Sequence, residues 1–133
     1  APEFIVLMIG INNSWAAEQP VAESIYQGVL ANLRALHARK PNARIVLQSL
    51  LPTNDAAKNK DLVLLVNQRL EALAKTSEFS KFTVYLNLYP AFTDASGIQI
   101  ANYFTDGLHP NDAGYQVWRD RLLESLKQAR AGR

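Results

Sequence analysis

Phe4–Ile9, with the sequence FIVLMI, is a short apolar run that ends at Gly10. Its length and its β-branched residues predict a strand, and its unbroken apolarity predicts burial of both faces, as in a parallel sheet. Two later runs also predict strands: Ala43–Leu51 (ARIVLQSLL), which stops before Pro52, and Phe82–Leu88 (FTVYLNL). The sequence therefore predicts three strands.

Helical patterns follow each predicted strand. The first, Pro20–Lys40, has apolar residues at spacings of three and four and ends where Pro41 blocks continuation. The second extends over about Lys58–Lys75 with one leucine-rich stripe. A closing helix follows Asn111, a predicted N-cap. Its expected inward-facing residues are Tyr115, Trp118, Leu122 and Leu126.

This order of elements defines the fold class. Strands that alternate with helices favour right-handed crossovers and a parallel sheet between helical layers, so we predict an α/β fold. An apolar opening strand left as a bare sheet edge would promote aggregation. We therefore expect a further strand, from residues before Ala1, to pair with Phe4–Ile9.

The composition argues against several classes of protein. The chain of 133 residues suits one domain, and no apolar run approaches the roughly 20 residues of a membrane-spanning helix. Lys and Arg number 14 against 12 Asp and Glu, too small an excess to indicate nucleic-acid binding. Without cysteine, and with two distant histidines, the chain predicts no metal site and no cofactor. We expect no signal peptide within these residues, because the start at Ala1 lacks a positively charged segment, and any export signal is expected upstream of Ala1.

Asp106 and His109 are candidate catalytic residues before the closing helix. Ligands of open α/β sheets bind beyond the carboxyl ends of the strands, where this segment is expected. A carboxylate three residues before a histidine can fix the tautomer of the imidazole and stabilise the imidazolium. We predict an Asp106 carboxylate oxygen within roughly 3.2 Å of His109 Nδ1. The same spacing, taken alone, also suits a capped turn.

Asn12 is the candidate in the loop after the first strand. Its side-chain N–H could donate to a developing oxyanion, although Gly and Asn are also ordinary turn formers after a strand. Ser14 is the serine nearest to Asn12 in the sequence, but it lies in the same loop and not on a nucleophile turn. Loop or helix positions are predicted for Ser24, Ser49, Ser96 and Ser125.

Together, the two segments resemble the SGNH, or GDSL-type, hydrolase family. Gly10-x-Asn12 after an apolar strand is similar to the third sequence block of that family, and Asp106-Gly107-Leu108-His109-Pro110 to the fifth, in the same order. The Gly-x-Asn-Asn form and the stretch Tyr103–Asn111 look most like bacterial relatives of platelet-activating-factor acetylhydrolase. The resemblance spans essentially the whole chain.

This resemblance implies a flavodoxin-like three-layer α/β/α sandwich that hydrolyses short acyl esters, such as acetyl esters, through a serine nucleophile. Asn12 would then be an oxyanion-hole donor, His109 the general base and Asp106 its orienting acid. Many members of the family have Asp where this chain has Asn13.

The first block of the family, Gly-Asp-Ser with the nucleophile, and the oxyanion glycine of the second block do not occur in this sequence. We therefore expect residues 1–133 to be the C-terminal part of a single hydrolase domain and to be inactive alone. The N-terminal half, in the same gene product or in another chain, would supply the serine.

Two other interpretations stay open. A flavodoxin-like module could hold a phosphate or nucleotide through backbone N–H groups of Gly10–Ser14, although this leaves Asp106 and His109 without a role. Alternatively, the chain is a non-catalytic fragment that completes a partner chain. A Gly-Asp-Ser after an apolar strand upstream of Ala1 would favour the esterase.

Overall fold

Three parallel strands form one sheet in a computed structural model that describes residues 4–8 and 21–131. They are β1 (Phe4–Leu7), β2 (Arg44–Gln48) and β3 (Thr83–Leu86), in the order β1-β2-β3. In this register Leu7 of β1 lies beside Leu47 of β2, which lies beside Tyr85 of β3. All three predicted strands are confirmed, and each is shorter than its apolar run.

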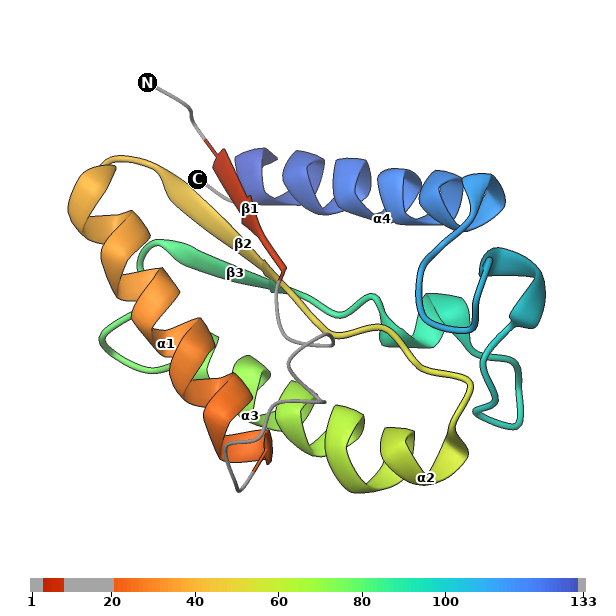
Figure 1. The fold of residues 1–133 in the computed structure, drawn as a ribbon. Coiled ribbons are helices and arrows are strands. Elements are labelled where there is room, and N and C mark those ends of the chain that lie inside the picture. The colour runs from red at the N-terminus through yellow and green to blue at the C-terminus, as the bar shows by residue number, and fades with distance from the viewer. Residues whose placement is uncertain (1–3, 9–20, 132–133) are drawn as a thin grey trace.

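Helices cover both faces of this sheet (Figure 1). α1 (Val21–Arg39) and α3 (Leu64–Ala74) lie on one face, and α4 (Asp112–Ala131) lies on the other. The predicted second helix is a composite, in which α2 (Ala56–Lys58) and a π-helical turn, Asn59–Val63, lead into α3. The arrangement confirms the predicted α/β fold, a flavodoxin-like sandwich of helices about a parallel sheet.

The larger part of the core lies between the sheet and the α1–α3 layer. Residues four apart share one face of a helix, so α1 buries Ile25, Val29 and Leu33 against the sheet. From β2, Ile45 and Leu47 enter the same cluster, because alternate residues of a strand face the same side.

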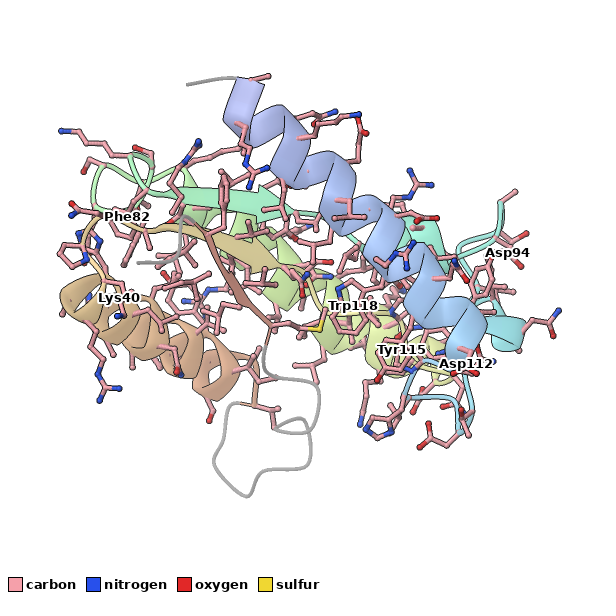
Figure 2. The ribbon with its side chains drawn as sticks, turned by 90° about the horizontal axis from the view of Figure 1, so that it is seen from above. Lys40, Phe82, Asp94, Asp112, Tyr115 and Trp118 are labelled. Atoms are coloured by element: carbon pink, nitrogen blue, oxygen red, sulfur yellow. The ribbon has the colours of Figure 1, made fainter. Side chains whose placement is uncertain are left out.

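The α4 face contains a smaller apolar cluster, formed by Leu51, Leu88, Phe92 and Phe104 with Val117 and Trp118 partly buried against it. The prediction that Tyr115 faces inward is wrong: its side chain is 52% exposed. Gly114, one residue earlier, is the buried contact, since a Cβ there would lie 2.2 Å from the Tyr103 carbonyl oxygen. Tyr115 instead stacks on Trp118 along the helix, with 5.7 Å between the ring centroids (Figure 2).

Gln48, the last residue of β2, carries an amide that is buried in the interior. It points to the α4 side, because Leu47 before it faces the α1–α3 core. Neither Oε1 nor Nε2 of Gln48 makes a hydrogen bond within residues 4–8 and 21–131. A desolvated amide that forms no hydrogen bond lowers the stability of the folded state.

We predict that Gln48→Met, which keeps the shape and removes the amide, raises the free energy of unfolding by about 1–3 kcal/mol. Urea unfolding measures the change. Asn67→Leu is the matched control: its buried amide accepts from Leu50 N (2.8 Å) and donates to Leu50 O (3.1 Å), so its loss should destabilise the fold. A less stable Gln48→Met protein would contradict the prediction.

Candidate active site

Residues 104–111 form a closed loop that delivers Asp106 and His109 beside the start of α4. Phe104 and Pro110 form an antiparallel bridge across its base, and Thr105 N donates to His109 O at 3.0 Å. At its tip Gly107 has a φ of +81°, a left-handed conformation that costs a side-chain-bearing residue about 1–2 kcal/mol. The glycine therefore makes the tight turn between the two candidates.

The predicted hydrogen bond between Asp106 and His109 is present. Oδ2 of Asp106 lies 2.8 Å from Nδ1 of His109. The other carboxylate oxygen, Oδ1, accepts from the backbone N–H groups of Leu108 (3.0 Å) and His109 (2.7 Å). Since an ionised carboxylate only accepts, Nδ1 of the neutral ring carries the proton, and Nε2 is left as a proton acceptor.

These contacts control the ionisation of Asp106. The hydrogen bond from the His109 side chain, followed by the two backbone N–H donors, holds the pKa of the carboxyl well below its usual range. Both side chains are open to solvent, with 53% of Asp106 and 56% of His109 exposed, so screening weakens their Coulombic attraction. The main effect of the pair is therefore to fix the orientation of the His109 ring.

A second set of hydrogen bonds attaches this loop to the segment after β2. The carbonyl oxygen of Gly107 accepts from Asn54 N at 3.1 Å and from Gln99 Nε2 at 2.8 Å. The same Nε2 donates to Pro52 O at 2.8 Å. We call these two side-chain contacts, from Gln99 to Pro52 and Gly107, the Gln99 bridge. Gln99 is not predictable from the sequence, because a single amide in an irregular loop carries no periodic or motif signal.

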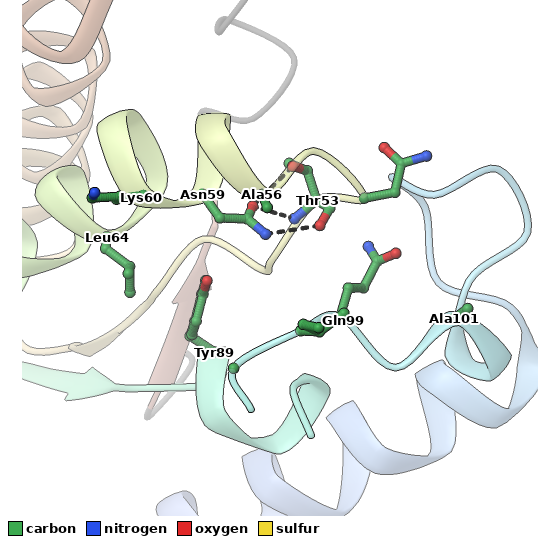
Figure 3. A pocket seen from close by; sticks show the side chains of 11 residues that line it. Thr53, Ala56, Asn59, Lys60, Leu64, Tyr89, Gln99 and Ala101 are labelled. Carbon is green, nitrogen blue, oxygen red and sulfur yellow. Dashed lines mark hydrogen bonds between the residues drawn. The ribbon is translucent and has the colours of Figure 1, made fainter. Parts of the chain in front are cut away.

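A pocket of about 330 Å³ lies beside the Gln99 bridge (Figure 3). Ala56, Leu64 and Ile98 contribute apolar walls, while the Gln99 side chain points toward the Thr53 segment across the pocket. Tyr89 also lines it, and burial raises the pKa of its hydroxyl. Because Gln99 touches Gly107, the pocket adjoins the loop that carries Asp106 and His109.

The remaining sequence candidates divide into structural residues and residues that the structure does not describe. Asn12, the predicted oxyanion donor, and Ser14 lie outside the described residues. Ser49 is fully buried, and its Oγ accepts from Leu88 N (2.9 Å) and Tyr89 N (3.2 Å), which is a structural role.

His37 lies at the amino end of the sheet, far from the loop. Its ring stacks on Phe82 with 3.7 Å between the ring centroids. In Figure 2, Phe82 is at the opposite end of the molecule from Tyr115 and the start of α4. This histidine therefore has a packing role and does not share a site with Asp106.

Within residues 4–8 and 21–131, no cluster of at least three His, Cys, Asp or Glu side chains could hold a metal ion. Among the helices of the same described part, none has the length and apolarity needed to span a membrane.

Comparisons with known proteins agree with this fold. The family model of GDSL-like lipases and acylhydrolases matches residues 1–117. The platelet-activating factor acetylhydrolase IB subunit beta homolog of Drosophila melanogaster is 47% identical over 51 residues, which cover 38% of this chain and 21% of the relative. The chain belongs to the GDSL-like lipase/acylhydrolase family.

Solved structures share the fold over nearly the whole chain. A Streptococcus pneumonia protein assigned as a platelet activating factor superposes with a TM-score of 0.71 at 25% identity, covering 93% of this chain and 59% of that protein. A carbohydrate esterase family 3 protein from Talaromyces cellulolyticus gives a TM-score of 0.73 at 23% identity, covering 96% of this chain and 58% of the other. The chain thus spans about three-fifths of the length of these structural relatives.

We predict that His109→Ala raises the pH at which Asp106 titrates, because it removes the contact that lowers the pKa of this carboxyl most. The two backbone donors remain, so part of the lowering should persist. With a lowered pKa, the stabilisation from ionised Asp106 is complete above the ordinary Asp pKa of about 3.9 and is lost as the pH falls below it. NMR titration of the Asp106 carboxyl carbon measures the shift. His37→Ala is the control and should leave the curve unmoved; an unmoved curve in His109→Ala would count against the assignment.

Proposed function

We propose that the complete protein is a serine esterase of the SGNH type that hydrolyses short acyl esters, with its nucleophile outside residues 1–133. The observation that carries the proposal is the 2.8 Å contact between Asp106 Oδ2 and His109 Nδ1 on a loop held to the end of β2. It leaves Nε2 as the base that acyl transfer by a serine requires.

In this proposal, His109 Nε2 takes the proton of the serine hydroxyl while the serine oxygen bonds to the acyl carbon. Asp106 holds the ring and stabilises the imidazolium. Asn12 donates its side-chain N–H to the carbonyl oxygen as that oxygen becomes negative. The imidazolium then gives its proton to the departing alcohol, and a water molecule repeats the sequence on the acyl-serine to release the acid and restore the serine.

The free edge of β1 supports a nucleophile supplied from outside these residues. Among the described residues β1 pairs only with β2, and Val6 on this apolar strand is 43% exposed. We propose that residues 1–133 form the C-terminal part of one hydrolase domain, and that a strand of the N-terminal half pairs with β1. This half would belong to the same gene product or to another chain.

The substrate is proposed as a small acyl ester. The esterase name of the Talaromyces structural neighbour and the acetylhydrolase name of the Drosophila relative support ester cleavage with an acetyl-sized acyl group. Three substrate classes differ in the alcohol or thiol that is released: sugar acetyl esters, lysophospholipids and thioesters. The values of kcat/KM that the complete protein shows for each would identify the preferred class.

The 133-residue chain alone is expected to hydrolyse an activated acetyl ester no faster than the uncatalysed background rate, because the Gly-Asp-Ser block with the nucleophilic serine does not occur in it. The complete protein should hydrolyse the ester and should be inactivated by a serine-directed phosphonate. Mass spectrometry should find the label outside residues 1–133. A label on Ser14 of an active 133-residue chain would overturn the assignment of the nucleophile, and a complete protein without ester hydrolysis would overturn the function.

Asn12→Ala in the complete protein is expected to lower kcat by about 10²–10³-fold with little change in KM, because a donor to the oxyanion acts mainly in the transition state. A turn-forming Asn12 gives the opposite pattern, a lower melting temperature with near-normal turnover of the folded fraction. Asn13→Ala, one residue later in the same loop, is the matched control for damage to the loop. Unchanged kcat in folded Asn12→Ala would remove Asn12 from the mechanism.

A further inference from the structure

Gln99 is a buried residue whose side-chain N–H groups donate to two segments distant in sequence from each other. Only 8% of the residue is exposed. Its Nε2 donates both hydrogens, to Pro52 O and to Gly107 O, each at 2.8 Å. Pro52 belongs to the segment that leaves the middle strand of the sheet, whereas Gly107 lies between Asp106 and His109. The side chain therefore joins the sheet to the candidate catalytic loop.

The loop's own hydrogen bonds set its shape. The Asp106 contacts to Leu108 and His109 and the Thr105–His109 bond all begin and end within residues 104–111. They would survive if the whole loop moved as a unit, so they do not determine its distance from the sheet.

Packing of Phe104 in the α4-side cluster places the base of the loop, and the contacts at Gly107 place its tip. The Gly107 carbonyl accepts from Gln99 Nε2 and from Asn54 N, and the space beside this glycine is tight, since a Cβ there would lie 2.2 Å from Asn54 Nδ2. Of the two donors, Gln99 also donates to Pro52 O, so its side chain links the loop to the strand exit. Because reaction requires the base, the nucleophile and the acyl carbon to meet closely, this distance bears on the rate.

We propose that Gln99 is a positioning residue of the esterase: the Gln99 bridge holds the Asp106–His109 pair at its working distance from the carboxyl end of the sheet. The inference rests on the proposed function. Gln99 acts through Gly107 and takes no part in proton transfer, so its effect falls on kcat and leaves the ionisation of the pair unchanged.

The test is Gln99→Met in the complete protein, assayed with an activated acetyl ester. Methionine matches the shape of glutamine and lacks both donors. A misplacement of about 1 Å can cost about 10²-fold in rate, so we expect kcat to fall about 10–100-fold, with KM changed less than about twofold. The inflection of the kcat–pH profile should stay where it is in the wild type.

Asn67→Leu is the matched control. Its amide is similarly buried and also holds the segment after β2, but both of its hydrogen bonds go to Leu50, through N and O, and neither goes to residues 104–111. This variant should lose stability in urea while its folded fraction keeps wild-type kcat. A folded Gln99→Met with wild-type kcat, or an equal loss of kcat in both variants at matched stability, overturns the proposal. A rise in KM alone also overturns it, because Gln99 would then act through the pocket that it lines.

A second readout separates this inference from the proposed function. Asn54 N donates to Gly107 O across the same gap, so its amide hydrogen exchange should be faster in Gln99→Met by about 10-fold and unchanged in Asn67→Leu. If the wild-type complete protein hydrolyses no ester, the proposed function fails while this measurement still tests the bridge. If Asn54 exchange is equal in wild type and Gln99→Met, the bridge fails whatever the activity.

Discussion

The buried, irregular segment that follows β2 is the constraint on which the rest of the structure depends. Residues 49–53 are buried but belong to no helix or strand. Ser49 N still donates to Leu86 O of β3, and the backbone groups beyond it need partners other than the strand ladder. Unpaired buried backbone groups are rare in folded proteins because each costs about as much as a lost hydrogen bond. Three amide side chains supply the partners: Asn67 pairs with Leu50, Asn59 with Thr53, and Gln99 with Pro52.

Those three amides come from different parts of the chain, and their hydrogen bonds connect the end of the middle strand with the helix after it and with the candidate site. Asn59 lies in the π-helical turn and Asn67 in α3, so the first two contacts attach the segment to the helix that follows it. Gln99 lies beyond β3, and its amide reaches the loop that holds the Asp106–His109 pair. Of the three amides, Gln99 is the one that links the exit of the middle strand to the loop of the candidate base.

Much of this structure could be predicted from the sequence, because strands, helices and single turns depend on residues that are close together in the chain. Apolar runs that end at Gly10 or Pro52 and helical spacings such as Ile25–Val29–Leu33 predict the α/β order, and the Asp106–His109 contact is confined to one turn. Residue roles came from the family resemblance. The exposure of Tyr115 was mispredicted because the spacing of a stripe does not indicate which edge of it packs.

The Gln99 bridge could not be predicted, since nothing in a loop glutamine indicates which two carbonyls, 47 and 8 residues away, it will join. Asp106 holds His109 through short-range contacts that need no other element, so the orientation of the candidate base is set within its own loop. Its distance from the sheet instead requires β2, the segment after it and Gln99 to be folded together. In such a site the chemistry of the base is encoded locally, whereas its alignment with a nucleophile is a property of the whole fold.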